Sequence, residues 1–441
     1  MIKKNDIIIN QCTDYSYMGF GVVKHDGFCV FVKGLMINEK AEIQIIAVKK
    51  DHGYGIIKKL LTQSKERVES PCNYYPICGG CQLLHMSYFE QLRFKQNYID
   101  RLLESTFNLK VEPIIGMHNP VAYRNKVQIP LSYDQDEIVG GFYRANTHDI
   151  IPIDKCIMQS DLANAVYNKA LALLNIYKLK DVVRHILIKH AFSRDEIMIV
   201  FVINQENIPN RSEIVNALSK IKEVKSIILN INKDKGNTIL GKKEKTIYGN
   251  NQIIDELMGY EFLISSQSFY QVNSYQTKEL YQLAYDMADL SKEDVLLDLY
   301  CGVGTIGIIA SQYVKKVIGI DIVADAIKDA KQNALINGVN NIDFYCGDAN
   351  ELTQELLAKG EYFDVIFVDP PRKGCDKATI DTIIKLNPNK VVYISCNPAT
   401  LARDLALFAQ EGYQAKRVRP VDMFPNTYHV ETVVLMTRED R

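Results

Sequence analysis

Three hydrophobic patterns follow one another along the chain, and the first covers residues 1–61. This segment contains short runs rich in β-branched and aromatic residues, separated by Gly, Asp and Asn. The runs fall at 7–10, 21–24, 28–32, 41–49 and 54–60. Five short strands joined by glycine turns are typical of a small barrel of the oligonucleotide-binding kind. We therefore expect a small β-barrel at the start of the chain.

The second pattern, over residues 62–265, mixes helical and strand periodicity. Apolar residues at helical spacing predict a helix over 87–107, which we expect to pack on the C-terminal domain. A second helix is predicted over 162–174, with Ser160 or Asp161 as its N-cap. The runs that predict strands are 128–133, 138–143, 185–191, 197–203 and 226–232, the first two forming a hairpin. This part of the chain is predicted to be a mixed α+β domain.

From residue 277 onward, apolar strands alternate with helical stretches. The expected strands are 295–299, 316–320, 343–345, 365–368 and 391–395, with a last strand at 432–437. Alternation of this kind predicts a parallel, doubly wound sheet. The fold class is thus multidomain α/β, with a C-terminal doubly wound domain over 266–441.

Composition adds limits to this picture. The 441 residues are 47% hydrophobic and 24% charged, which is ordinary for a globular protein and excludes disorder as the main state. Lys plus Arg number 52 against 53 for Asp plus Glu, so any affinity for nucleic acid must come from local patches. No apolar run reaches the roughly 18 residues of a membrane span, and no secretory signal is visible. We expect a cytoplasmic monomer without a membrane partner.

A glycine loop follows the first strand of the C-terminal domain. The strand 295–299 leads into Tyr300-Cys301-Gly302-Val303-Gly304, and Asp321 ends the next strand. Glycines allow a ligand to approach the backbone closely, and an acid at this place can accept both hydroxyls of a ribose. The third glycine of the dinucleotide fingerprint is absent. The arrangement resembles the S-adenosylmethionine site of class I methyltransferases, which implies that Asp348 contacts the adenine.

Two further strands of this sheet end in reactive residues. Asp369-Pro370-Pro371-Arg372 follows the fourth strand, and Cys396 follows the fifth, just before a helix. Because a helix N-terminus favours the thiolate, this position predicts a lowered pKa and a nucleophilic thiol. Near the C-terminus, His429 and Glu431 precede the last strand. Methylation of a pyrimidine at C5 needs such a thiolate, which adds at C6, and a base that removes the C5 proton.

These motifs together resemble the RNA uracil-5-methyltransferase family. The likeness rests on Asp369-Pro370-Pro371-Arg372, on Ser395-Cys396-Asn397-Pro398, on His429-Val430-Glu431 and on Ser268-Phe269-Tyr270-Gln271-Val272-Asn273. It implies that Gln271 and Tyr300 contact S-adenosylmethionine, that Cys396 is the nucleophile, and that Glu431 removes the proton. We also expect Asp321, Asp348 and Asp369 to contact the cofactor. The N-terminal segment resembles a TRAM domain, the RNA-binding module of the branch that methylates 23S ribosomal RNA.

Ten cysteines are present, and three of them lie within ten residues. In a reducing cytosol, clustered cysteines indicate metal binding or catalysis. Cys72, Cys78 and Cys81 would supply three thiolates, and Cys156 would supply a fourth. Zinc and an iron–sulfur cluster both accept four thiolates, and spacing alone favours zinc slightly. The family resemblance implies a [4Fe–4S] cluster instead, with a structural role.

Two alternatives to a 23S ribosomal RNA enzyme remain. One is the branch of the family that methylates tRNA, which we expect to lack the N-terminal barrel, so that residues 1–61 count against it. The other is a non-catalytic RNA-binding or ribosome-assembly factor that kept the fold. Cys396 and Glu431 count against the second alternative.

Overall fold

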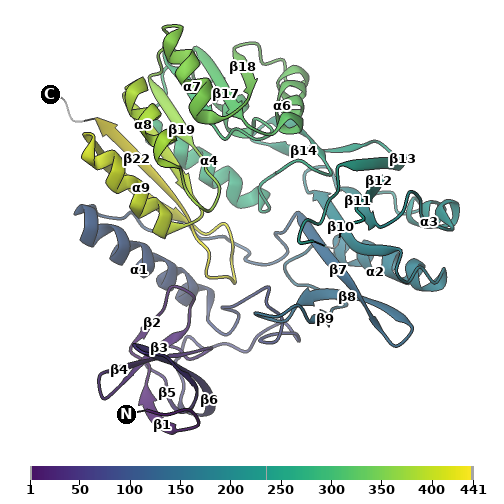
Figure 1. The fold of residues 1–441 in the computed structure, drawn as a ribbon, viewed down its shortest axis with the longest axis vertical. Helices are drawn as coiled ribbons and strands as arrows, with labels where there is room; N and C mark the ends of the chain where they lie inside the picture. Colours follow the sequence, from purple (N-terminus) through teal and green to yellow (C-terminus); the bar gives the residue numbers. More distant parts are fainter. Residues whose placement is uncertain (1, 235, 439–441) are drawn as a thin grey trace.

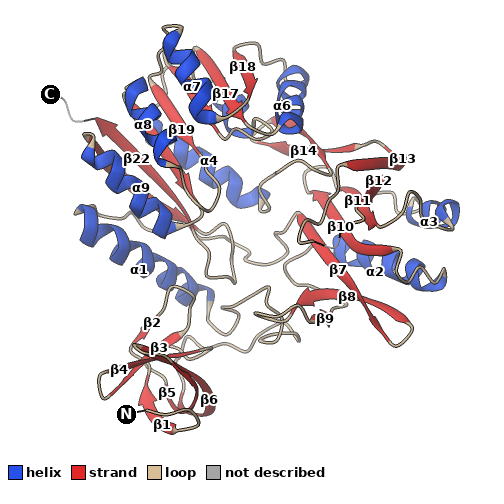
Figure 2. Cartoon of the chain, viewed as in Figure 1, coloured by secondary structure: helices blue, strands red, loops and turns tan. Residues whose placement is uncertain are grey.

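The computed structural model describes residues 2–234 and 236–438, and its elements form three large sheets with helices around two of them (Figure 1). Residues 1, 235 and 439–441, which belong to the predicted domains 1–61, 62–265 and 266–441, lie outside the described residues. Figure 2 shows that the first segment of the chain consists of strands and loops, whereas the other two segments mix helices with strands. The coarse division into a multi-sheet α/β protein is confirmed.

The N-terminal segment forms a six-stranded sheet in the order β1-β5-β6-β4-β3-β2. Its strands are β1 Ile7–Gln11, β2 Asp14–Tyr15, β3 Gly21–His25, β4 Phe28–Val32, β5 Lys40–Val48 and β6 His52–Thr62. Neighbours pair antiparallel except β4 and β6, which are parallel. Apolar side chains of one face, among them Val23, Val30 and Ile43, form a small core that excludes water.

The central segment is built on a seven-stranded sheet in the order β13-β12-β11-β10-β7-β8-β9. Its strands are β7 Lys126–Asp134, β8 Glu137–Tyr143, β9 Ile150–Pro152, β10 Val183–Ala191, β11 Glu196–Ile203, β12 Val224–Ile231 and β13 Lys243–Gly249. Two helices, α2 Asp161–Ile176 and α3 Arg211–Leu218, accompany it. The side chain of Ser160 caps α2 by accepting a hydrogen bond from the backbone N–H of Ala163, as the sequence indicated.

The C-terminal segment contains a second seven-stranded sheet in the order β18-β17-β16-β19-β20-β22-β21. Its strands are β16 Val295–Leu299, β17 Lys316–Asp321, β18 Ile342–Cys346, β19 Val365–Val368, β20 Lys390–Ser395, β21 Tyr413–Val421 and β22 Glu431–Arg438. The first five are parallel, as predicted, and the last two are antiparallel. The helices are α4 Ser274–Ala288, α5 Thr305–Ala310, α6 Ala324–Ile336, α7 Ala349–Ala358, α8 Lys377–Leu386 and α9 Pro398–Gln410.

Two further elements connect these sheets. The hairpin of β14 Gln252–Leu257 and β15 Tyr260–Ser265 lies between the central and C-terminal sheets. The helix α1 Tyr88–Phe107, capped by the side chain of Ser87, lies beside α9, far from it in sequence (Figure 1). Among residues 2–234 and 236–438, no helix is both long and apolar enough to cross a bilayer.

Candidate active site

A cavity of about 460 Å³ opens at the carboxyl edge of the C-terminal sheet. This is the edge at which open parallel sheets bind ligands. Six of the predicted site residues line it together: Gln271, Tyr300, Asp321, Asp369, Cys396 and Glu431. They come from the loop before α4 and from the ends of five different strands, so the topology assembles a site that is scattered over 161 positions of the sequence.

The glycine loop between β16 and α5 forms one wall of the cavity. Tyr300, Gly302 and Gly304 all have positive φ, at 64°, 55° and 83°. Such a φ is unfavourable for a tyrosine, and backbone strain of this kind is concentrated at functional sites. The Asp321 carboxylate holds the loop, because its Oδ2 accepts a hydrogen bond of 2.9 Å from the N–H of Gly302. Its side chain stays partly exposed toward the cavity.

Asp369 and Gln271 face each other across the cavity. The Gln271 Nε2 lies 3.5 Å from Asp369 Oδ2, at the limit of a hydrogen bond. Desolvation raises the pKa of Asp369 to about 7, and the bond from Gln271 opposes that rise. The carboxyl group is therefore close to changing its charge at neutral pH.

Residues of the central segment form hydrogen bonds to the loop that carries Gln271. The Asn125 side chain donates to the carbonyl of Gln271 at 2.8 Å, and its backbone N–H donates to Val272 at 2.9 Å. The buried Lys189 ammonium donates to the carbonyls of Ser265 and Ser268, at 2.6 and 2.9 Å. One wall of the cavity thus depends on contacts between two sheets.

Cys396 lies at the end of β20, two residues before α9, and its side chain is partly exposed. The side chain of Asn397 caps α9 and also donates to the carbonyl of Arg372 at 3.0 Å. The Thr400 hydroxyl donates to the same carbonyl at 3.3 Å. These bonds tie the Asp369–Arg372 loop to the helix that follows the cysteine, which brings both predicted motifs to one place.

The expected lowering of the thiol pKa is wrong. Burial raises the pKa of Cys396 to about 12, and the charges of Glu431 and Asp369 raise it further. The Arg372 guanidinium opposes this rise without cancelling it. Desolvation and two carboxyl groups outweigh the helix N-terminus, because the dipole contributes only about 0.3–1 kcal/mol in most settings. The free protein therefore holds a neutral thiol.

Glu431 is 4% exposed, and its Oε2 has no hydrogen-bond partner among the described residues. Burial raises the pKa of this carboxyl well above its ordinary range, and the charge of Asp369 acts in the same direction. An unpaired oxygen that faces a cavity is available to a ligand. His429 does not line the cavity, and burial lowers the pKa of its imidazole to about 4, so it is neutral at pH 7.

Asp348 stands apart from the other predicted residues. It does not line the cavity, and its Oδ1 caps α7 by accepting hydrogen bonds from the N–H groups of Asn350 and Glu351. The residues that line the cavity without a predicted role include two phenylalanines, Phe269, which is 60% exposed, and Phe424. Phe269 stands within the motif around Gln271, whereas no local pattern marks Phe424.

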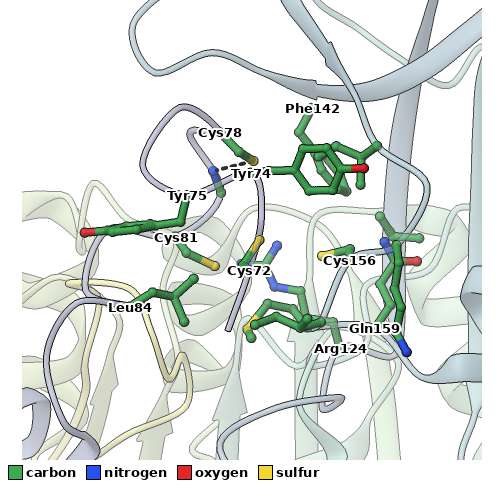
Figure 3. A pocket seen from close by; sticks show the side chains of 16 residues that line it. Cys72, Tyr74, Tyr75, Cys78, Cys81, Leu84, Arg124, Phe142, Cys156 and Gln159 are labelled. Carbon is green, nitrogen blue, oxygen red and sulfur yellow. Dashed lines mark hydrogen bonds between the residues drawn. The ribbon is translucent and has the colours of Figure 1, made fainter. Parts of the chain in front are cut away.

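The four cysteines of the predicted cluster line a second, smaller cavity of about 50 Å³. Figure 3 shows the side chains of Cys72, Cys81 and Cys156 pointing toward a common space, with Arg124 beside them. All four are free thiols. Within the part of the chain that the structure describes, no group of three or more His, Cys, Asp or Glu side chains has the spacing of a metal site. The cluster therefore stays a prediction.

Comparison with known proteins agrees with the fold. Residues 87–439 match the family described as tRNA (uracil-5-)-methyltransferase. An uncharacterized RNA methyltransferase of Clostridium tetani is 42% identical, over 99% of this chain and 97% of its own length. One of Staphylococcus aureus is 44% identical, over 98% of both chains.

A solved structure extends this comparison to three dimensions. The tRNA (uracil-54, C5)-methyltransferase of Pyrococcus abyssi, in complex with S-adenosyl-L-homocysteine, superimposes with a TM-score of 0.78 at 26% identity. The match covers 98% of this chain and 100% of the other. The chain belongs to the tRNA (uracil-5-)-methyltransferase family and is an S-adenosylmethionine-dependent enzyme that methylates uracil in RNA at C5.

Proposed function

We propose that this enzyme methylates a uridine of 23S ribosomal RNA through a covalent bond between Cys396 and C6 of the base. The observation that carries the mechanism is the pairing of two groups in one cavity: a partly exposed thiol and a buried carboxyl with an unpaired oxygen. The first group is suited to nucleophilic addition, and the second is suited to removing a proton.

Two residues carry the reaction. Cys396 loses its thiol proton to solvent as its sulfur forms a bond to C6, and the electrons of the C5–C6 double bond move to the O4 oxygen as an enolate. When bound, S-adenosylmethionine would supply an electrophilic methyl group, which C5 takes up as the methyl–sulfur bond breaks and S-adenosylhomocysteine leaves. Glu431 then removes the proton from C5, the double bond forms again, and the bond between Cys396 and C6 breaks. The raised pKa of Glu431 makes its ionised form a stronger base.

The other cavity residues fit the cofactor and the base. Asp321, already holding the glycine loop, would accept the ribose hydroxyls, and Tyr300 and Gln271 would contact the remainder of the cofactor. Asp369 lies between this part of the cavity and the Cys396 motif, so we propose a contact there as well. The adenine contact of Asp348 remains a proposal that its role as a helix cap does not support.

Two observations bear on the choice of RNA. The expectation that residues 1–61 count against tRNA is wrong, because a tRNA enzyme aligns with 98% of this chain and therefore includes the N-terminal sheet. The four cysteines and the N-terminal segment, through the family resemblance, support 23S ribosomal RNA, and the Pyrococcus abyssi enzyme supports tRNA as the second candidate.

One experiment separates these candidates. We would incubate the purified enzyme with methyl-labelled S-adenosylmethionine and with equimolar amounts of 23S ribosomal RNA and a mixture of tRNAs. Both RNAs are transcribed in vitro, so that they carry no modification. We expect label in the 23S RNA, as 5-methyluridine, and none with Cys396→Ala. Label in tRNA alone would replace the first candidate by the second, and label carried by Cys396→Ala would reject the covalent mechanism.

We also propose that Cys72, Cys78, Cys81 and Cys156 hold a [4Fe–4S] cluster. The described side chains do not have the spacing of a metal site, so the support is the kind of donor: four free thiols from two distant segments line one cavity. The N–H of Gly80 donates to the Cys78 sulfur at 3.4 Å, and N–H···S bonds are among the contacts that tune such clusters. The cluster would tie these segments together and stabilise the fold, since part of metal-binding free energy is folding free energy.

Elemental analysis of anaerobically purified protein tests this proposal. We expect about four irons per chain. Cys81→Ser should lose them, whereas Cys346→Ser, a change at an exposed cysteine on β18, should keep them. One zinc per chain without iron would reject the cluster and favour a zinc site.

A further inference from the structure

The loop between β21 and β22 delivers the proposed base to the cavity. Val421 pairs with Glu431 at the end of this antiparallel pair, so residues 422–430 form the connecting loop. Phe424 of this loop and Glu431 at its end both line the active-site cavity. The position of the carboxyl group thus depends on how the loop is held.

The loop is held by one face of helix α1. Tyr88, Gln91 and Lys95 follow at spacings of three and four residues, which places them on the same side of a helix. The Tyr88 hydroxyl donates to Asp422 Oδ2 at 2.9 Å, and the Lys95 ammonium donates to Asp422 Oδ1 at 2.5 Å. Lys95 also donates to the carbonyl of Phe424 at 3.1 Å.

Gln91 binds the middle of the loop in both directions. Its Oε1 accepts a hydrogen bond of 2.8 Å from the N–H of Asn426, and its Nε2 donates to Asn426 Oδ1 at 3.1 Å. Asn426 has a φ of 68°, a conformation that needs such support in a residue with a side chain. The N–H groups of Gln82 and Leu83, which directly follow Cys81, donate to the Asn426 carbonyl at 3.0 and 3.1 Å.

These contacts are buried and polar, so they specify one arrangement. The side chains of Lys95 and Asp422 are 0% exposed, and Gln91 and Asn426 are 2% and 4% exposed. A buried ion pair adds little net stability compared with apolar residues of the same shape, and its best-supported use is to fix a conformation. Helix α1 therefore fixes the conformation of the loop that leads into Glu431.

We propose that Tyr88, Gln91 and Lys95 are positioning residues for the Glu431 carboxyl group. This inference rests on the proposed role of Glu431 as the base. Because elimination alone uses that group, disturbing the α1 face should slow release of the methylated RNA from Cys396. Binding of S-adenosylmethionine and addition of the thiolate should change little, since neither Gln271 nor Asp321 contacts this face.

Single-turnover kinetics with Gln91→Leu test the proposal. We would measure the dissociation constant of S-adenosylmethionine, the rate at which methyl enters the covalent adduct, and the rate at which the adduct resolves. We expect resolution to slow about tenfold or more, because displacing a catalytic group by about 1 Å can cost a hundredfold. The first two quantities should stay within about twofold of wild type.

Gln96→Leu is the matched control. Gln96 stands on the same helix and also accepts a backbone N–H, from Ile114 at 2.7 Å, but it does not bond the 422–430 loop. We expect wild-type resolution of the adduct. Should Gln91→Leu fail to fold, Tyr88→Phe removes only a hydroxyl and should slow resolution about twofold to tenfold.

Three outcomes would overturn the inference. The first is a folded Gln91→Leu, or Tyr88→Phe in its place, that resolves the adduct at the wild-type rate. The second is an equal loss in all three quantities, which indicates general damage. The third is a Glu431→Gln variant that resolves the adduct at the wild-type rate, which would reject both the proposed base and the positioning role. If Glu431→Gln resolves the adduct slowly while the α1 variants resolve it normally, only the positioning role is rejected.

Discussion

The raised pKa of Cys396 predicts that this nucleophile reacts slowly in the free enzyme. With a pKa of about 12, roughly one thiol in ten thousand is ionised at about pH 8. An ordinary thiol, with a pKa of about 8.5, is roughly one quarter ionised at the same pH. The thiolate is the reactive form, and a thiolate of higher pKa is intrinsically more nucleophilic, so we expect alkylation of Cys396 to be about a hundredfold slower than that of an unperturbed cysteine.

Timed alkylation with iodoacetamide measures this directly. The enzyme without RNA is sampled between about pH 7 and about pH 10, and the peptides are quantified by mass spectrometry. The exposed Cys346 serves as an internal reference. The rate at Cys396 should rise about tenfold per pH unit over the whole range.

Two variants identify the cause of the shift. Asp369→Asn removes a charge that raises the pKa of Cys396, so alkylation should become faster. Arg372→Ala removes the charge that lowers it, so alkylation should become slower. A plateau below about pH 9, or variants that change the rate in the opposite directions, would refute the electrostatic account.

Three other changes follow from the same structure. Asp321→Asn weakens the hydrogen bond to the Gly302 N–H and the proposed ribose contact. Calorimetry should therefore show that the affinity for S-adenosylmethionine falls about tenfold to a hundredfold, and an unchanged affinity would count against this site. Burial lowers the pKa of Lys189 to about 7, so between about pH 7 and pH 10 this group binds more protons in the unfolded chain and contributes stability that increases with pH; over this range, chemical denaturation of Lys189→Met should show a less positive change of stability with pH than the wild type, and an identical pH dependence would contradict this. Gly319→Ala places a methyl group 2.6 Å from the Phe344 ring and should cost about 1–3 kcal/mol of stability, whereas Gly236→Ala, at an exposed glycine where the added methyl group meets no atom within 4 Å, should cost less.

The C-terminal sheet could be predicted closely from the sequence. Strands such as β16 and β19 are buried along their whole length, so they read as continuous apolar runs between glycine and proline signals. β13 and β21 gave no comparable signal. β13 is mostly exposed and polar, and β21 carries charged residues such as Arg417, which pairs with Glu112.

The site could be predicted only as far as local motifs reach. Gln271, Cys396 and Glu431 stand in recognisable motifs, and the fold brings them to one cavity. The contacts of Asn125 and Lys189 with the Gln271 loop link different sheets, so no local pattern reveals them. The thiol pKa was misjudged for a related reason, because desolvation depends on the packing of distant segments.

Trapping with 5-fluorouridine tests the covalent bond between Cys396 and C6 of the base. Fluorine at C5 cannot leave as a proton, so the bond between Cys396 and C6 should persist after methyl transfer. RNA that carries 5-fluorouridine is incubated with the enzyme and S-adenosylmethionine, and denaturing mass spectrometry locates the attached nucleotide. We expect one methylated nucleotide on Cys396 in the wild-type enzyme and none in Cys396→Ala. An adduct on another cysteine, or no adduct from an enzyme that methylates ordinary uridine, would contradict it.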